Sequence, residues 1–221
     1  MEEIRILYED GDTLVIDKPA GLLSEASDTA PSVITALLSH STDGFLSPIT
    51  RLDREVSGVM LLAKNKKSAA HYTAQMADRE VFKKEYVAVV SGCMEEKSGT
   101  LKDLLFKDSA KNKSYAVKRM RRGVKEASLF YTVLDETVQN DRPLSLVHIC
   151  LHTGRTHQIR VQFSSRRHPL VGDRKYGGDG AYPMGLLSYR LTFRSTRGKQ
   201  VTLVSEKGGD LPFSLFPPFA L

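Results

Sequence analysis

Short apolar segments of strand length recur along this chain, and they constrain its fold more than any other feature of the sequence. The first two, IRILYED and TLVIDKPAG, flank an Asp-Gly turn at residues 10–11 and predict a hairpin. Because neighbouring segments can pair, the pattern favours an α+β fold with a mixed, mainly antiparallel central sheet. The further predicted strands are GVMLLAK (58–64), KKEYVAVVSG (83–92), EASLFYTVLDE (126–136), LSLVHICLHTG (144–154), LLSYRLTFRST (186–196) and KQVTLVSE (199–206).

Helices are expected to flank this sheet, and fewer segments have their pattern. The predicted helices are PSVITALLSH (31–40), KKSAAHYTAQMADRE (66–80) and THQIRVQFSS (156–165). In the last of them Thr156 is the expected N-cap residue. No repeat, linker or low-complexity stretch divides the 221 residues. We therefore expect a single domain over residues 1–221.

The composition favours an ordinary globular protein. Hydrophobic residues make up 41% and charged residues 26% of the chain, and no apolar run approaches the roughly 18 residues of a membrane span. The N-terminus MEEIRILYEDGD lacks the basic start and apolar core of a signal peptide. The two cysteines, Cys93 and Cys150, form no disulfide framework. We therefore expect a cytoplasmic monomer that makes no contact with a membrane.

Positive charge is concentrated in one segment. The formal net charge is +6 and the sequence pI is about 9.3. Residues 107–125, KDSAKNKSYAVKRMRRGVK, hold many lysines and arginines against the single acid Asp108. Such a segment would release counterions from a phosphate backbone on binding nucleic acid. A solvated basic loop that binds nothing is the alternative that charge alone leaves open.

Histidine and cysteine are zinc ligands, and VHICLHTGRTH brings several of them together. His148, Cys150 and His152 would point to one face of a strand. The paired ligand spacing of a zinc site is missing, and no carboxylate or second cysteine lies nearby in the sequence. The chain also has neither a Walker A loop nor a dinucleotide fingerprint. We therefore expect no bound metal and no cofactor.

Two further segments place charged groups close together. In RLDREVSG, Asp53 stands between Arg51 and Arg54, which favour an ionised carboxylate but are equally typical of a structural ion pair. In TGRTHQIR, Arg155 follows Gly154 at a turn before a helix, which suits either an anion site or a capped helix with a surface arginine.

Taken in order, these segments resemble the RluA-type pseudouridine synthase family. DKPAGLL (17–23) is similar to its first motif, RLDREVSGVMLLAK (51–64) to its second, and KKEYVAVVSG to the segment with the active-site tyrosine. LHTGRTHQIRVQF (151–163) and HPLVGDRKYG (168–177) are similar to its third. The resemblance implies the pseudouridine synthase fold. It also implies isomerisation of a uridine in structured rRNA or tRNA, without a cofactor.

The resemblance assigns roles to residues of this chain. Asp53 is the essential carboxylate, as nucleophile or as base, and Arg155 is its basic partner. Tyr86 stacks on the extruded base, and its hydroxyl can relay a proton. The residues expected to bind RNA are Arg51, Arg54, Lys118, Arg119, Arg121, Arg122, Thr156, His157 and Arg160.

Several features set this chain apart within the family. It begins too close to the first motif to hold an N-terminal S4 domain, so we expect a minimal member consisting of the catalytic domain. Thr50, Val56 and Leu187 depart from the family motifs, and we expect them to affect substrate fit more than chemistry. The alternative function is a catalytically silent RNA-binding or ribosome-assembly protein on the same fold.

Overall fold

The computed structural model describes residues 4–41, 43–219 and 221. Contacts divide the chain into two compact units, each built from separate stretches of sequence. The first unit comprises Met1–Lys84 and Leu187–Lys207, and the second comprises Glu85–Leu186 and Gly208–Leu221. The expectation of one domain over residues 1–221 stays a prediction.

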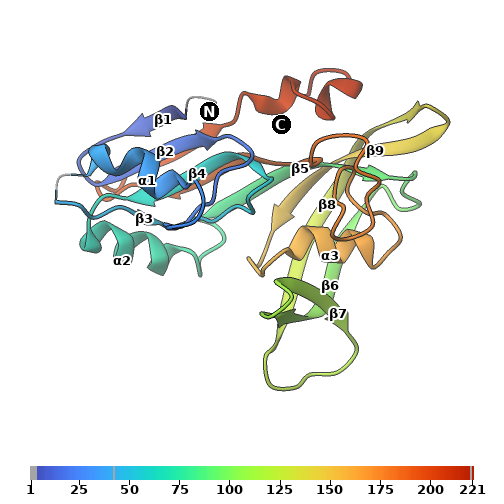
Figure 1. The fold of residues 1–221 in the computed structure, drawn as a ribbon, viewed down its shortest axis with the longest axis horizontal. Coiled ribbons are helices and arrows are strands. Elements are labelled where there is room, and N and C mark those ends of the chain that lie inside the picture. The colour runs from blue at the N-terminus through green and yellow to red at the C-terminus, as the bar shows by residue number, and fades with distance from the viewer. Residues whose placement is uncertain (1–3, 42, 220) are drawn as a thin grey trace. The chain divides into compact units, whose positions relative to one another are not determined.

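Most strands of the first unit are ones that the apolar segments predicted; the short β3 is not among them (Figure 1). Strands β1, β2, β4 and β10 lie in that order, β11 pairs with β10 and β3 pairs with β4. Asp10 closes the predicted hairpin, because its carboxylate accepts hydrogen bonds from the backbone of Asp12 and Thr13. The strands are β1 (Arg5–Glu9), β2 (Thr13–Lys18), β3 (Ser47–Pro48), β4 (Ser57–Ala63), β10 (Leu186–Arg194) and β11 (Gln200–Val204).

Helices cover part of this sheet. α1 (Val33–Leu37) starts at Ser32, whose hydroxyl accepts from the Thr35 amide, and it continues into the short 3-10 helix η1 (Leu38–His40). α2 (Lys66–Gln75) starts with a capping box at Asn65. Its Tyr72 is fully buried in the same core cluster as Leu61 of β4, so α2 packs on the sheet through this ring.

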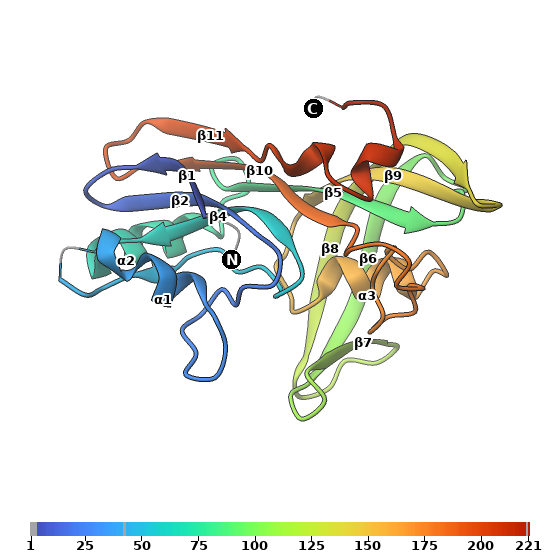
Figure 2. The ribbon, with the colours of Figure 1, turned by 45° about the horizontal axis from the view of Figure 1, so that its top comes forward.

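The second unit is an antiparallel sheet in the order β5, β9, β8, β6, β7 (Figure 2). Of the strand pairs described in both units, β4 with β10 is the parallel one. The predicted α+β fold with a mixed, mainly antiparallel sheet is therefore confirmed. The strands are β5 (Lys83–Ser91), β6 (Ser98–Asp108), β7 (Lys113–Val117), β8 (Val124–Gln139) and β9 (Arg142–Leu151).

α3 (Gln158–Ser164) is the helix of the second unit, and it is shorter than predicted. It lies against β6 and β8, where Val161 joins Leu105 and Ala127 in a buried cluster (Figures 1 and 2). The remaining short helices are η2 (Lys207–Gly209) and η3 (Phe213–Leu215). Across the residues that the structure describes, no helix combines the length and apolarity needed to span a membrane.

Candidate active site

Asp53 lies half-buried in the loop between β3 and β4. Its backbone carbonyl accepts from the Val56 amide at 3.0 Å, which closes a turn around it. The buried Ser24 holds the preceding residue, because its hydroxyl donates to the Leu52 carbonyl at 2.7 Å and accepts from the Leu52 amide at 3.0 Å. The loop backbone next to the carboxylate is therefore ordered by hydrogen bonds rather than left to solvent.

Lys18, the last residue of β2, forms hydrogen bonds with the same loop from inside the protein. Its ammonium is fully buried and donates to the carbonyls of Pro19 at 3.0 Å, Arg54 at 3.1 Å and Val56 at 2.8 Å. Burial lowers the pKa of this ammonium to about 8, although the charges of Glu55 and Asp53 act in the opposite direction. The first and second motifs thus form one hydrogen-bonded structure around Asp53.

The arginines beside Asp53 bind the loop of the first motif. Arg54 donates from Nε to the Gly21 carbonyl at 3.0 Å, and its own carbonyl accepts from the Gly21 amide at 2.8 Å. Arg51 forms an ion pair with Glu25, with Nη1 2.9 Å from Oε1. Both side chains are exposed to solvent. They nevertheless connect the Asp53 loop to the loop that follows β2.

Gly58, in the middle of the second motif, occupies a position that no larger residue fits. Its φ is +116°, and a Cβ there would lie 2.2 Å from the backbone oxygen of Ser188 in β10. Ser188 in turn donates from its hydroxyl to the Val59 carbonyl at 2.9 Å. Only glycine satisfies both the backbone conformation and this close approach of the two parallel strands.

The three departures from the family motifs are buried. Val56 is 2% exposed and Leu187 is fully buried, while the Thr50 hydroxyl accepts from the Leu61 amide at 2.9 Å. Each therefore serves packing or a backbone hydrogen bond of the first unit.

Tyr86 and Arg155 belong to the second unit. Tyr86 lies in β5 opposite Ile149 of β9 and is 7% exposed. Arg155 is exposed in the turn between β9 and α3, and its Nε donates to the Glu126 carbonyl at 2.8 Å.

Gln158 shapes the turn that carries Arg155, and the sequence reasoning missed it. Its buried Oε1 accepts from the Arg155 amide at 3.0 Å and from the Thr153 hydroxyl at 2.7 Å. A glutamine three residues after an arginine in a Gly-containing turn was the signal that could have found this contact, because its side chain reaches back to the turn amides.

The start of α3 differs from the prediction. Thr156 is not the N-cap: that position belongs to His157, whose backbone is left-handed with φ 53° and which makes no side-chain cap hydrogen bond. The backbone carbonyl of Thr156 instead accepts a hydrogen bond from the Ser114 hydroxyl at 2.8 Å. The helix start is set by this contact with β7 rather than by a local cap.

Arg160 and His157 are interior side chains. Arg160 is 7% exposed and binds Asp173 through two hydrogen bonds of 2.6 and 2.7 Å. The His157 ring lies 2.8 Å from the Tyr176 hydroxyl. Both side chains thus have partners within the second unit, and their contact with RNA stays a prediction.

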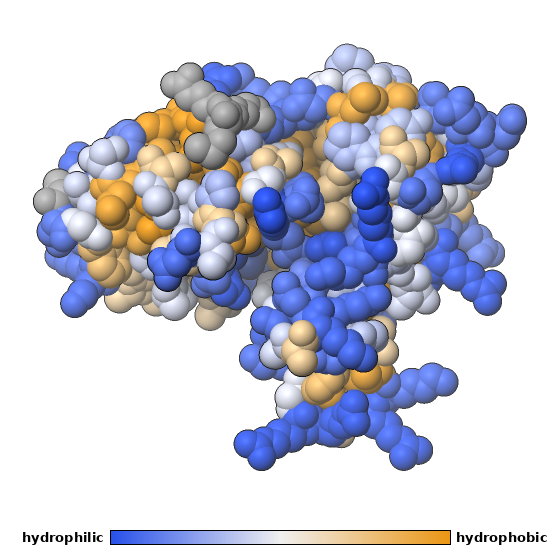
Figure 3. Space-filling model, in the orientation of Figure 1, coloured by the Kyte–Doolittle hydropathy of each residue, from blue (hydrophilic) through white to orange (hydrophobic). Residues whose placement is uncertain are grey.

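The basic segment 107–125, called the basic hairpin below, comprises the β6–β7 hairpin and the loop that joins β7 to β8. It contains the end of β6, all of β7 and the start of β8. Figure 3 shows hydrophilic side chains projecting around the end of this hairpin, with apolar surface between them. Arg121 stacks over the Phe106 ring at 5.1 Å. The exposed members include the cations Lys107, Lys111, Lys118, Arg119, Arg121, Arg122 and Lys125, together with Tyr115 and Met120.

A carboxylate lies beside His148, contrary to what the sequence spacing suggested. Oε2 of Glu85 in β5 lies 2.9 Å from the His148 Nε2 in β9, and the Cys150 Sγ lies 4.0 Å from the same nitrogen. Burial on its own lowers the pKa of His148, but its hydrogen bonds with Cys150 and Glu85 outweigh burial and raise that pKa to about 9. His152 instead contacts the Ser128 hydroxyl at 3.0 Å.

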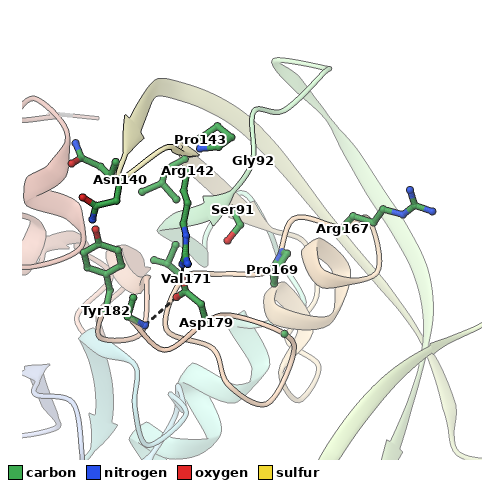
Figure 4. Close-up of a pocket in the computed structure, with 14 residues that line it drawn as sticks. Ser91, Gly92, Asn140, Arg142, Pro143, Arg167, Pro169, Val171, Asp179 and Tyr182 are labelled. Carbon is green, nitrogen blue, oxygen red and sulfur yellow. Dashed lines mark hydrogen bonds and ion pairs between the residues drawn. The ribbon is translucent and has the colours of Figure 1, made fainter.

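The second unit also has a surface cavity of about 580 Å³ next to the β8–β9 hairpin (Figure 4). Arg142 forms an ion pair with Asp179 in this cavity, whereas the Arg167 side chain points away from the other labelled residues. None of the site residues expected from the sequence lines it.

The fold has solved counterparts. The human protein RNA Pseudouridylate Synthase Domain Containing 1 aligns with a TM-score of 0.77 and 24% identity over 96% of this chain and 86% of its own. Human RNA Pseudouridylate Synthase Domain Containing 4 aligns with a TM-score of 0.73 and 23% identity over 91% and 88%. The architecture is therefore that of pseudouridylate synthases.

Sequence relatives lead to the same class. An uncharacterized RNA pseudouridine synthase of Aquifex aeolicus is 36% identical over 195 residues, which are 84% of this chain and 60% of that protein. Ribosomal large subunit pseudouridine synthase D of Yersinia pestis is 35% identical over 186 residues, which are 81% and 54%. Residues 12–165 match the RNA pseudouridylate synthase family, and the chain belongs to that family. It spans little more than half the length of these relatives.

Proposed function

We propose that this protein is an RNA pseudouridine synthase that converts a uridine in structured rRNA or tRNA to pseudouridine. The observation that carries the proposal is the Asp53 loop, which Lys18 and Ser24 hold by buried hydrogen bonds. A carboxylate on a preordered loop can act on a substrate without the free-energy cost of first ordering its own backbone. The family relatives support the same activity.

Asp53 is the essential carboxylate of the proposed reaction, as nucleophile at the ribose or as base. The N1–C1′ bond breaks, the uracil turns, and C5 bonds to C1′. The proton that leaves C5 balances the one that N1 gains, so the reaction is an isomerisation and requires no cofactor. Tyr86 is the proposed stacking partner of the base and proton relay, and Arg155 the proposed basic partner of the carboxylate.

The residues proposed to bind RNA are the exposed cations of the basic hairpin in the second unit and Arg51 and Arg54 in the first. A target base must leave its stack, which costs a few kcal/mol, and phosphate contacts made by these cations offset that cost. Arginine beside aromatic rings, as at Phe106, also suits contacts with unstacked bases. We retain the predictions of a monomer that works in the cytoplasm.

The test is conversion of uridine by the purified chain. Cellular rRNA and tRNA are incubated with wild type, Asp53→Asn or the matched control Glu55→Gln, and pseudouridine is mapped by carbodiimide adducts. We expect conversion at a defined uridine with wild type and Glu55→Gln and none with Asp53→Asn. Full activity of Asp53→Asn would overturn the proposed mechanism. If the Asp53→Asn protein binds RNA and fulfils its cellular role as well as wild type does, the catalytically silent alternative is favoured.

A further inference from the structure

Three potential metal ligands meet on one face of the second unit's sheet. In the antiparallel pair of β5 and β9, Glu85 lies opposite Cys150, and Val87 lies opposite His148. Because cross-strand partners share a face, the Glu85, His148 and Cys150 side chains lie on the same side. Their donor atoms all lie within 4.8 Å of one another.

The geometry separates metal binding from a catalytic triad. In a thiol-imidazole-carboxylate triad the nucleophile and the carboxylate use different ring nitrogens, so that a proton passes across the ring. Here the carboxylate oxygen at 2.9 Å and the sulfur at 4.0 Å both face Nε2 of His148. The three groups therefore direct their donor atoms to a shared point instead of forming a relay.

We propose that Glu85, His148 and Cys150 bind a divalent transition-metal ion, with zinc as the best match. Zinc bond lengths of about 2.0–2.3 Å in tetrahedral geometry require donor atoms roughly 3.4–3.6 Å apart. The carboxylate oxygen of Glu85 lies 2.9 Å and the sulfur of Cys150 lies 4.0 Å from Nε2, one below and one above this range. Small side-chain rotations therefore bring the three donor atoms to the required distances. The thiolate favours zinc over magnesium or calcium, which bind through oxygen.

The surroundings suit a site with three protein ligands and one open position. The side chains of Glu85 and His148 are 11% and 16% exposed, which limits competition from water but leaves a path for the ion. Three protein ligands leave the fourth tetrahedral position to water. An ion here links β5 to β9 directly beside Tyr86, and so stabilises the strand that carries it. No step of the proposed isomerisation requires the ion.

The test uses Co²⁺ as a spectroscopic probe for the zinc site. The full chain is treated with chelator and titrated with Co²⁺, while the near-ultraviolet charge-transfer band of a cobalt–thiolate bond is recorded. We expect one equivalent to produce the band and Zn²⁺ to abolish it by competition. Cys150→Ser should remove the band, and Glu85→Gln should weaken binding on the order of 10- to 100-fold.

Cys93→Ser is the matched control, because Cys93 is the other free cysteine and is exposed. It should bind Co²⁺ as wild type does. Circular dichroism of each variant verifies that it is folded, so that loss of the band reports the ligand and not the fold. A folded wild type without the band, or a band that survives Cys150→Ser, overturns the proposal. Because the readout is metal binding, its outcome is independent of pseudouridine formation.

Discussion

The buried ammonium of Lys18 donates a hydrogen bond to the Val56 carbonyl at 2.8 Å, across the loop that carries Asp53. Two more carbonyls, those of Pro19 and Arg54, share the same ammonium. The lysine of one family motif therefore orders the backbone of the next, and the position of the proposed catalytic carboxylate depends on it.

Replacing Lys18 by methionine should slow catalysis more than it weakens RNA binding. The variant keeps most of the length of the side chain but leaves three carbonyls without their donor, so the Asp53 loop loses its order. We expect a 10- to 100-fold lower single-turnover rate, equivalent to about 1.4–2.7 kcal/mol, at an RNA Kd close to that of wild type. Lys64→Met is the control, because Lys64 is also buried but pairs with Glu9. Equal rates in the two variants would contradict the role of Lys18.

The same lysine should make stability depend on pH. Its folded-state pKa of about 8 lies below the ordinary 10.5, so between these values the unfolded chain binds more protons than the folded one. Stability relative to Lys18→Met therefore rises with pH across this window, by on the order of 3 kcal/mol. Urea unfolding of both proteins from pH 7 to pH 10.5 measures the difference. A constant difference would show that Lys18 is not protonated differently in the two states.

Gly58→Ala should unfold or severely destabilise the first unit. The added Cβ would lie 2.2 Å from the Ser188 oxygen, on a backbone with φ +116°. We expect a loss of more than about 3 kcal/mol, combining overpacking with backbone strain. Gly198→Ala is the matched control, since Gly198 also has positive φ (+80°) but open space around its Cβ. Thermal unfolding compares the two, and similar losses would mean that the contact with Ser188 is unimportant.

Neutralising the basic hairpin should reduce the salt dependence of RNA binding. A variant with Lys118, Arg119, Arg121 and Arg122 changed to glutamine removes exposed cations without disturbing the buried network at Arg160. The slope of log K against log salt should fall by about 0.7–0.9 for each phosphate that the variant no longer neutralises. Filter binding across a salt series measures it. Changing the exposed Lys66 and Lys67 of α2 to glutamine controls for loss of positive charge elsewhere, and an equal effect per removed charge would refute a specific RNA surface on the hairpin.

Local patterns predicted much of the sheet. The β1–β2 hairpin follows from its turn and apolar runs, and β4, β5 and β9 follow from their length and β-branched residues. β6 and β7 escaped prediction because their sequences, SGTLKDLLFKD and KSYAV, mix charged with apolar residues. β6 pairs with β8, and β7 pairs with β6 and donates from the Ser114 amide to the Tyr176 hydroxyl. The β6–β8 pairing and the contact with Tyr176 join residues distant in the sequence.

The sequence by itself determined most of the strands, the order of the family motifs and the residues that carry them, because turns, periodicity and motif spacing are local properties. Only the tertiary structure decided that Lys18 is buried under the Asp53 loop and that Arg160 belongs to the interior with Asp173. It also brought Glu85 to His148 and Cys150, because strand register chooses which side chains meet. Register and burial depend on contacts between distant parts of the chain, which no single segment encodes.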